Sequence, residues 1–156
     1  MILQCKTGSS RLTLKVDGYE FPDEPLGPTE DNPPDEFETA RWLIVTFGFC
    51  FESQIWSVTG PYAKTSEIEL LADWFDSIAI GDPSADGIRF IERDIEFTFN
   101  QRVSSLTVHL FRDFLPPLNR TCESFDMEFS LVEIELAGAS NELRTILKRF
   151  PERPAI

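Results

Sequence analysis

Basic residues are scarce in this sequence. Its 156 residues include 27 Asp and Glu but only 14 Lys and Arg, with one histidine, and the formal net charge is −13. Nucleic-acid binders hold phosphates with clustered Lys and Arg, so this balance argues against direct nucleic-acid binding. It favours a basic protein partner, because an acidic surface accelerates encounter with one. An acidic surface that only keeps the protein soluble is an equal alternative.

Cysteine and long apolar runs are also scarce. The three cysteines, Cys5, Cys50 and Cys122, are far apart and form no Cys-x-x-Cys pair, which is typical of a reducing compartment and argues against a disulfide scaffold. The first residues lack the charged start and apolar core of a signal peptide. No apolar run approaches the roughly 20 residues of a membrane helix. We therefore expect a cytoplasmic protein that does not enter a membrane.

Catalytic motifs are missing as well. The sequence contains no Gly-x-Ser-x-Gly, no His-Glu-x-x-His and no phosphate-binding glycine-rich loop. His109 is the only histidine, and a lone histidine on a strand is more often structural than catalytic. Paired carboxylates can hydrolyse a substrate, but in so acidic a chain such pairs arise by chance. We expect no enzyme activity, no cofactor and no metal.

Alternating apolar residues are abundant. Ile95, Phe97 and Phe99 alternate with polar residues, which is the pattern of a half-exposed strand, and residues 42–51 are apolar enough for a central strand. The predicted strands cover residues 2–6, 11–21, 42–51, 55–58, 88–92, 94–100, 106–111 and 125–129. Together with two helical segments they predict an α+β fold, a largely antiparallel β-sheet with two α-helices packed on it. At this length we expect a single domain, residues 1–156.

The first helical segment has clear ends. Ser66 and Glu69 fit a Ser-x-x-Glu capping box at its start, and Gly81 followed by Asp82-Pro83 fits its end. Apolar residues recur at helical spacing between these signals, which predicts an amphipathic helix over residues 66–80.

The last segment is ambiguous. Alternation of Val132, Ile134 and Leu136 would extend the preceding strand, whereas Ser130 with Glu133 would begin a helix that runs to about residue 150. A glycine and a serine in the middle of this segment also leave a kink or a late helix start open.

Residues 22–38 differ from the rest of the chain. Five prolines rule out a regular helix or central strand, and seven acidic residues occur without any basic residue. The carboxylate spacing does not match a calcium-binding loop. We predict a long acidic loop, which is either functional or simply a solvated connection.

Exposed acids provide four candidate surfaces for a basic partner. The helix over 66–80 presents one acidic stripe, the strands at 94–100 and 125–129 each present two acids on one face, and the acidic loop is the fourth surface. A run of charge is more often a solvated face than a contact site. The candidate partner-binding residues are Glu69, Asp73, Asp76, Asp94, Glu96, Asp126, Glu128, Asp31, Asp35 and Glu36.

Several passages resemble the WapI family of bacterial immunity proteins. They are the helical segment 65–78, the segment 106–117 with its Pro-Pro loop, the strand at 125–129 and the closing residues 147–151, within a similarity that covers about residues 40–151. The resemblance implies a non-catalytic protein that binds and neutralises the toxin domain of a secreted toxin, with a tRNA-cleaving nuclease as the prototype target. A nuclease that grips RNA is basic, so the acidic balance of this chain suits that role.

Two other functions stay open at this stage. The 14 phenylalanines could line a small-molecule pocket instead of filling a core. In a structural subunit, Trp42, Trp56 and Trp74 would be interface aromatics, although tryptophans in a soluble domain more often lie in the core.

Overall fold

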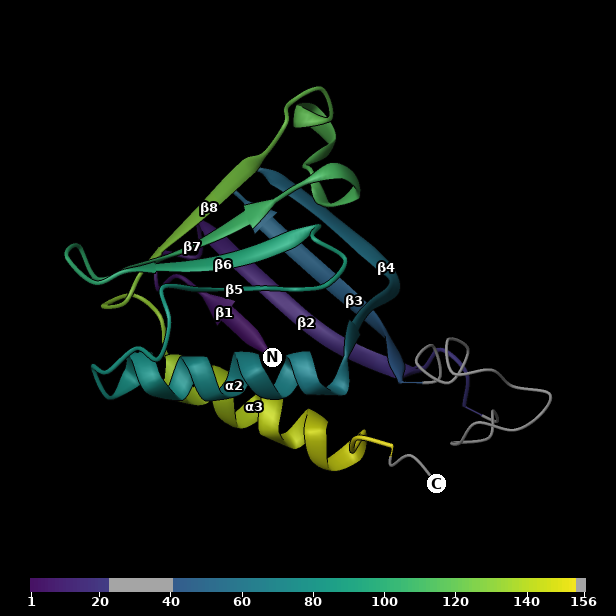
Figure 1. Cartoon of the computed structure of the whole chain (residues 1–156). Helices are drawn as coiled ribbons and strands as arrows, with labels where there is room; N and C mark the ends of the chain where they lie inside the picture. The colour runs from purple at the N-terminus through teal and green to yellow at the C-terminus, as the bar shows by residue number, and fades with distance from the viewer. Residues whose placement is uncertain (23–40, 154–156) are drawn as a thin grey trace.

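The computed structural model describes residues 1–22 and 41–153 (Figure 1). Most of the predicted acidic loop, with Asp31, Asp35 and Glu36, therefore lies outside the described residues.

The N-terminal half forms one antiparallel sheet in chain order. Its strands are β1 (Ile2–Gln4), β2 (Ser10–Tyr19), β3 (Trp42–Phe51) and β4 (Gln54–Lys64). The predicted central position of residues 42–51 is confirmed, since β3 pairs with β2 on one side and β4 on the other. Its odd-numbered residues from 43 to 49 are buried and the residues between them are half-buried, so one face of β3 lies in the core.

The C-terminal half repeats this arrangement. A second antiparallel sheet, again in chain order, contains β5 (Gly87–Arg89), β6 (Ile95–Asn100), β7 (Ser105–Leu110) and β8 (Phe125–Ser130). Two short 3-10 turns, η1 (Arg112–Phe114) and η2 (Pro117–Asn119), connect β7 to β8.

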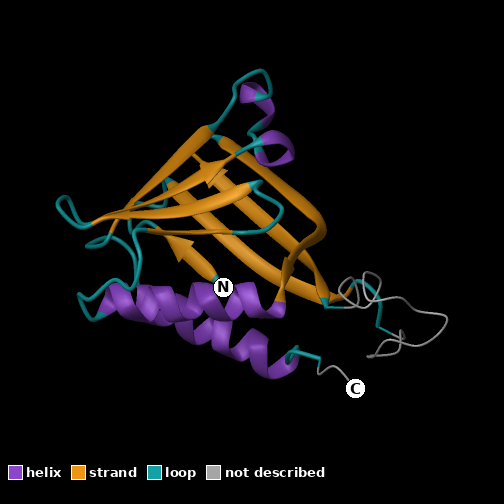
Figure 2. Cartoon of the chain, viewed as in Figure 1, coloured by secondary structure: helices purple, strands orange, loops and turns teal. Residues whose placement is uncertain are grey.

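One helix follows each sheet. α2 (Thr65–Ala79) and α3 (Leu136–Arg149) pack along each other on one side of both sheets (Figure 2). The α+β class, antiparallel pairing and two packed helices are confirmed. The structure adds that the strands divide into two sheets, because α2 carries the chain about 22 Å, at 1.5 Å per residue, between β4 and β5.

The start of α2 differs from the predicted capping box. The helix begins at Thr65, and Glu67 rather than Glu69 reaches back, its Oε2 accepting the Lys64 N–H at 2.8 Å. Glu67 Oε1 also accepts the Ile91 N–H at 2.6 Å, a tertiary contact that no local pattern encodes. The predicted end is confirmed: Gly81 has φ +78° and donates its N–H to the Ile78 carbonyl at 2.9 Å.

The ambiguous last segment resolves as a late helix start. β8 ends at Ser130, whose carbonyl accepts the Glu133 N–H at 2.9 Å and closes a turn. The Glu133 carbonyl accepts the Lys6 N–H at 3.1 Å, which ties this turn to the β1–β2 connection. α3 begins only at Leu136, so both the strand extension and a helix from Ser130 are wrong.

Aromatic side chains fill the space between the sheets and helices. Phe47 of β3 contacts Phe114 with ring centroids 5.2 Å apart, and Phe75 of α2 contacts Phe97 of β6 at 6.2 Å. Trp56 and Trp74 are buried, so both serve the core and are not interface aromatics; Trp42 is half-buried. Across residues 1–22 and 41–153, none of the helices has the length and apolar character needed to span a bilayer.

Candidate functional site: an acidic face on the second sheet

Strand register brings three of the predicted acids together. β6, β7 and β8 are paired so that Glu96 lies opposite His109, and His109 lies opposite Asp126. The neighbouring row aligns Thr98, Thr107 and Glu128. Side chains at these positions point away from the core, whose residues alternate with them along each strand. We call this surface the acidic face; it comprises Glu96, Thr98, Thr107, His109, Asp126 and Glu128.

Hydrogen bonds fix the orientation of the row around His109. Its Nδ1 lies 2.7 Å from Asp126 Oδ1, and its Nε2 lies 2.8 Å from the Thr98 hydroxyl. Arg89 of β5 donates to Glu96 at 2.8 Å from the next strand. The row therefore runs cation, carboxylate, imidazole, carboxylate across four strands, and each member is oriented by its neighbour.

The acidic face is hollowed. A polar hollow of about 840 Å³ is lined by Thr98, Thr107, Asp126 and Glu128 and by residues 101–103 at the tip of the β6–β7 hairpin. Asp126 and Glu128 are exposed at its rim. The hollow is open to solvent, and its lining includes hydroxyls, carboxylates and the guanidinium of Arg102.

The charges on this face are unevenly balanced. Arg89 neutralises Glu96, and His109 hydrogen-bonds to Asp126. Glu128 and Asp86, both at the hollow, form no ion pair with any residue that the structure describes. The hollow is thus lined by the carboxylates of Asp86, Asp126 and Glu128 and by one cation, Arg102, so its lining is net acidic.

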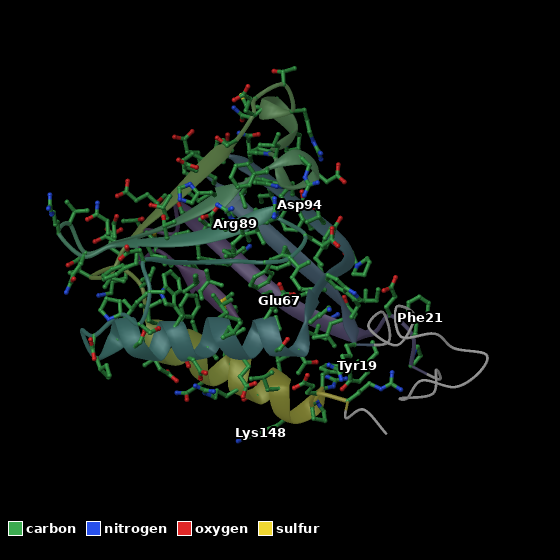
Figure 3. All side chains as sticks on the ribbon, in the orientation of Figure 1. Tyr19, Phe21, Glu67, Arg89, Asp94 and Lys148 are labelled. Atoms are coloured by element: carbon green, nitrogen blue, oxygen red, sulfur yellow. The ribbon has the colours of Figure 1, made fainter. Side chains whose placement is uncertain are left out.

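Asp94 does not belong to the acidic face, contrary to the prediction that it shares an exposed strand face with Glu96. It precedes β6, is only 7% exposed and accepts a hydrogen bond from Arg112 Nε at 2.6 Å. Burial raises the pKa of the Asp94 carboxyl, and the Arg112 guanidinium opposes that shift. Figure 3 shows where Asp94 and Arg89 lie on the second sheet.

The predicted acidic stripe on α2 is largely engaged within the protein. Arg144 of α3 donates to Asp73 Oδ1 and to Asp76 Oδ2, at 2.6 Å in each case. The Ser140 hydroxyl and the Arg144 guanidinium hold the pKa of the Asp76 carboxyl below its usual value. Glu69 alone stays exposed without an ion pair to another described residue. Asp73 and Asp76 therefore connect α2 to α3, and only Glu69 presents a charge without an ion-pair partner among the described residues.

Thr98, His109 and Asp126 occupy the order of a hydroxyl, base and carboxylate triad. Thr98 and His109 lie on the inner strands β6 and β7, Asp126 lies on the outermost strand β8, and the Thr98–Thr107 pairing uses the backbone on that side of β6. These side chains form a hydrogen-bonded row on the outer surface of the second sheet. Among the described residues no group of three or more His, Cys, Asp or Glu side chains is placed to hold a metal.

Sequence reasoning set His109 aside as structural and did not select Thr98 or Asp86. The signal that would have found them is register: once β6, β7 and β8 are aligned, His109 must lie between Glu96 and Asp126. Strand alternation identifies the face of each residue but not its neighbour on the next strand.

Comparison with known proteins identifies the protein family. The family model described as the Immunity protein WapI-like family matches residues 2–151 of the 156. No curated protein and no solved structure matches the chain. The match extends the resemblance over residues 40–151 to β1 and β2 of the first sheet. Because it covers nearly the whole chain, this protein belongs to the Immunity protein WapI-like family.

Proposed function

We propose that this protein binds and neutralises a cognate toxin domain that carries a basic surface, and that it acts by occupying that surface without chemistry of its own. The acidic face carries the proposal, since Asp126 and Glu128 border an open hollow. Membership in an immunity family supports a toxin as the class of partner.

A nuclease that cleaves RNA, such as tRNA, is the toxin that this surface suits best. Such an enzyme holds phosphates with Lys and Arg, so its cleft is basic. Carboxylates on an inhibitor compete for the same cations and also steer the two proteins together. Tight nuclease–inhibitor pairs are among the strongest non-covalent complexes. Complementary charge on the two surfaces is one source of their fast association.

The other predicted acids contribute less to this proposal. Asp73 and Asp76 already bind Arg144, and Asp94 is buried against Arg112. Moving those carboxylates to a toxin would break contacts that hold the fold. Glu128 is exposed and has no ion pair to a described residue, so it can meet a partner without such a loss. Asp126 is exposed beside His109, Glu96 is half-buried beside Arg89, and Glu69 is a separate, smaller surface on α2.

We place this activity in the cytoplasm. Cys5, Cys50 and Cys122 are all free: one is buried, one half-buried and one exposed. Free and widely spaced thiols suit a reducing compartment. An RNA-cleaving toxin would also meet its substrate there.

A tagged pull-down against the toxin domain encoded immediately upstream tests the proposal. We expect a stoichiometric complex that abolishes the toxic activity. If no complex forms while a small molecule raises the melting temperature, the toxin proposal is wrong and a ligand-binding module replaces it.

A further inference from the structure

β8 is the outermost strand of the second sheet. It pairs with β7, and among the described residues no strand is hydrogen-bonded to its other side (Figure 1). The other sheet edges differ. β1 and β5 have three residues each and lie against α3 and α2, and β4 lies beside the 3-10 turn η1. β8 also approaches β2 of the first sheet, but the two strands are not paired. β8 is thus a sheet edge that combines a six-residue length with acidic side chains.

Neighbouring hydrogen bonds establish which β8 backbone groups face the open edge. The Leu131 N–H donates to the Ser104 carbonyl at 3.0 Å, which continues the β7–β8 ladder by one hydrogen-bonded pair. Such pairs recur at every second residue in an antiparallel ladder. Phe129 and Met127 therefore bond to β7, while the N–H and C=O groups of Glu128 and Asp126 point away from it.

Two further hydrogen bonds agree with this assignment of inward and outward backbone groups. The Ser130 carbonyl accepts the Glu133 N–H, so it is not directed at β7. The Phe111 N–H donates to the Asp94 carbonyl at 2.9 Å, which directs the alternate residues of β7, including Val108 and Leu106, toward β8.

Asp126 and Glu128 thus present two features on the same edge. Their backbone groups are unpaired in the ladder, and their carboxylates lie on the acidic face. A strand paired with β8 would place its own side chains directly opposite these carboxylates, with Cβ atoms about 4.5–5.5 Å apart. Opposite charges at such positions stabilise a pair and like charges destabilise it.

We propose that β8 is the docking edge for a strand of the toxin in which Lys or Arg recurs at every second residue. Backbone hydrogen bonds to Asp126 and Glu128 provide the affinity, and the two carboxylates select basic side chains. This assignment rests on the proposed function, since it names the mode by which the toxin binds. A second copy of this chain is a poor occupant, because its β8 would bring acids opposite acids.

Amide hydrogen exchange, followed residue by residue in the free protein and in the toxin complex, tests the proposal. Unpaired amides exchange fast. We expect those of Asp126 and Glu128 to exchange fast in the free protein and to slow by about a hundredfold or more in the complex, as a newly bonded and buried amide does. A complex in which both stay fast overturns strand addition but leaves toxin binding intact. The absence of any complex overturns both proposals.

Proline substitution provides the matched variants. Glu128→Gln removes the charge only, and Glu128→Pro also removes the outward N–H. We expect Glu128→Pro to bind the toxin about tenfold more weakly than Glu128→Gln. Ser57→Pro is the control. The Glu52 N–H donates to the Ser9 carbonyl, so the even-numbered residues of β3 bond to β2 and its odd-numbered residues bond to β4. The N–H of Ser57 therefore points to the outer edge of β4, as position 61, a proline, also does. Equal affinity of the two Glu128 variants, with both folded by circular dichroism, would reject the backbone contact.

Discussion

Glu67 is a charged residue that the fold has buried. It is 6% exposed, and its two carboxylate oxygens accept the N–H groups of Lys64 and Ile91. Burial raises the pKa of the Glu67 carboxyl, and the two N–H donors oppose this shift. A single side chain therefore caps α2 and also holds the segment after β5 against it (Figure 3).

Glu67→Ala leaves both N–H groups without an acceptor. We expect the free energy of unfolding to fall by about 2 kcal/mol, the usual cost of buried donors left unsatisfied. Urea denaturation at neutral pH measures this change. Glu69→Ala, an exposed glutamate on the same helix, is the control and should stay within about 0.5 kcal/mol of the parent. Equal losses would show that Glu67 has no special role.

Glu128 tests which acidic surface meets the toxin. Glu128→Lys places a cation at the rim of the hollow, so we expect association with the toxin to slow about tenfold or more. Glu69→Lys makes the same charge change at another exposed glutamate that has no ion pair to a described residue. Stopped-flow association kinetics compare the two. A larger effect of Glu69→Lys would move the contact to α2.

At the scale of elements, Arg144 joins the two helices. Its guanidinium bonds Asp73 and Asp76 of α2, and the Ser140 hydroxyl of α3 donates to the Ala72 carbonyl at 3.2 Å. The ion pairs are partly exposed, so each contributes little by itself. Their effect is to orient α3 after its late start.

This junction has a predictable pH dependence. The pKa of Asp76 is held below its ordinary value of 3.8, so its stabilisation is complete above that pH and is lost as pH falls through the lowered value. Arg144→Met keeps the stem and should cost less than about 1 kcal/mol at neutral pH. The difference from the parent should shrink below pH 3.8 in urea denaturation. Lys148→Met, exposed on the same helix, is the control. A difference independent of pH would contradict the ion-pair explanation.

Elements were predictable where the signal is local. Alternating residues located the strands, and Gly81 located the end of α2 because its φ of +78° suits glycine. The starts of both helices could not be predicted from local sequence. Glu67 is selected as the cap by its contact with Ile91, and the turn before α3 is held by Lys6, more than a hundred residues away in sequence. Local capping patterns contain no information on such contacts.

The whole molecule carries a net charge of −13. Raising the ionic strength from about 0.01 M to about 0.15 M shortens the Debye length from about 30 Å to about 8 Å. We expect the association rate with the toxin to fall by about tenfold or more over this range, while the dissociation rate changes much less. Kinetics at several salt concentrations measure both rates. An association rate independent of salt would exclude steering by the acidic surface.

The sequence by itself determined the class of fold, the strands and the C-terminal ends of the two helices, because these follow from alternation, turn residues and helical spacing. It also determined the excess of acid that suits a basic partner. Only the tertiary structure decided which acids act together. Register across β6, β7 and β8 gathers Glu96, Asp126 and Glu128. Arginines on other elements engage Asp73, Asp76 and Asp94. Both outcomes depend on contacts between distant parts of the chain, which no local pattern specifies.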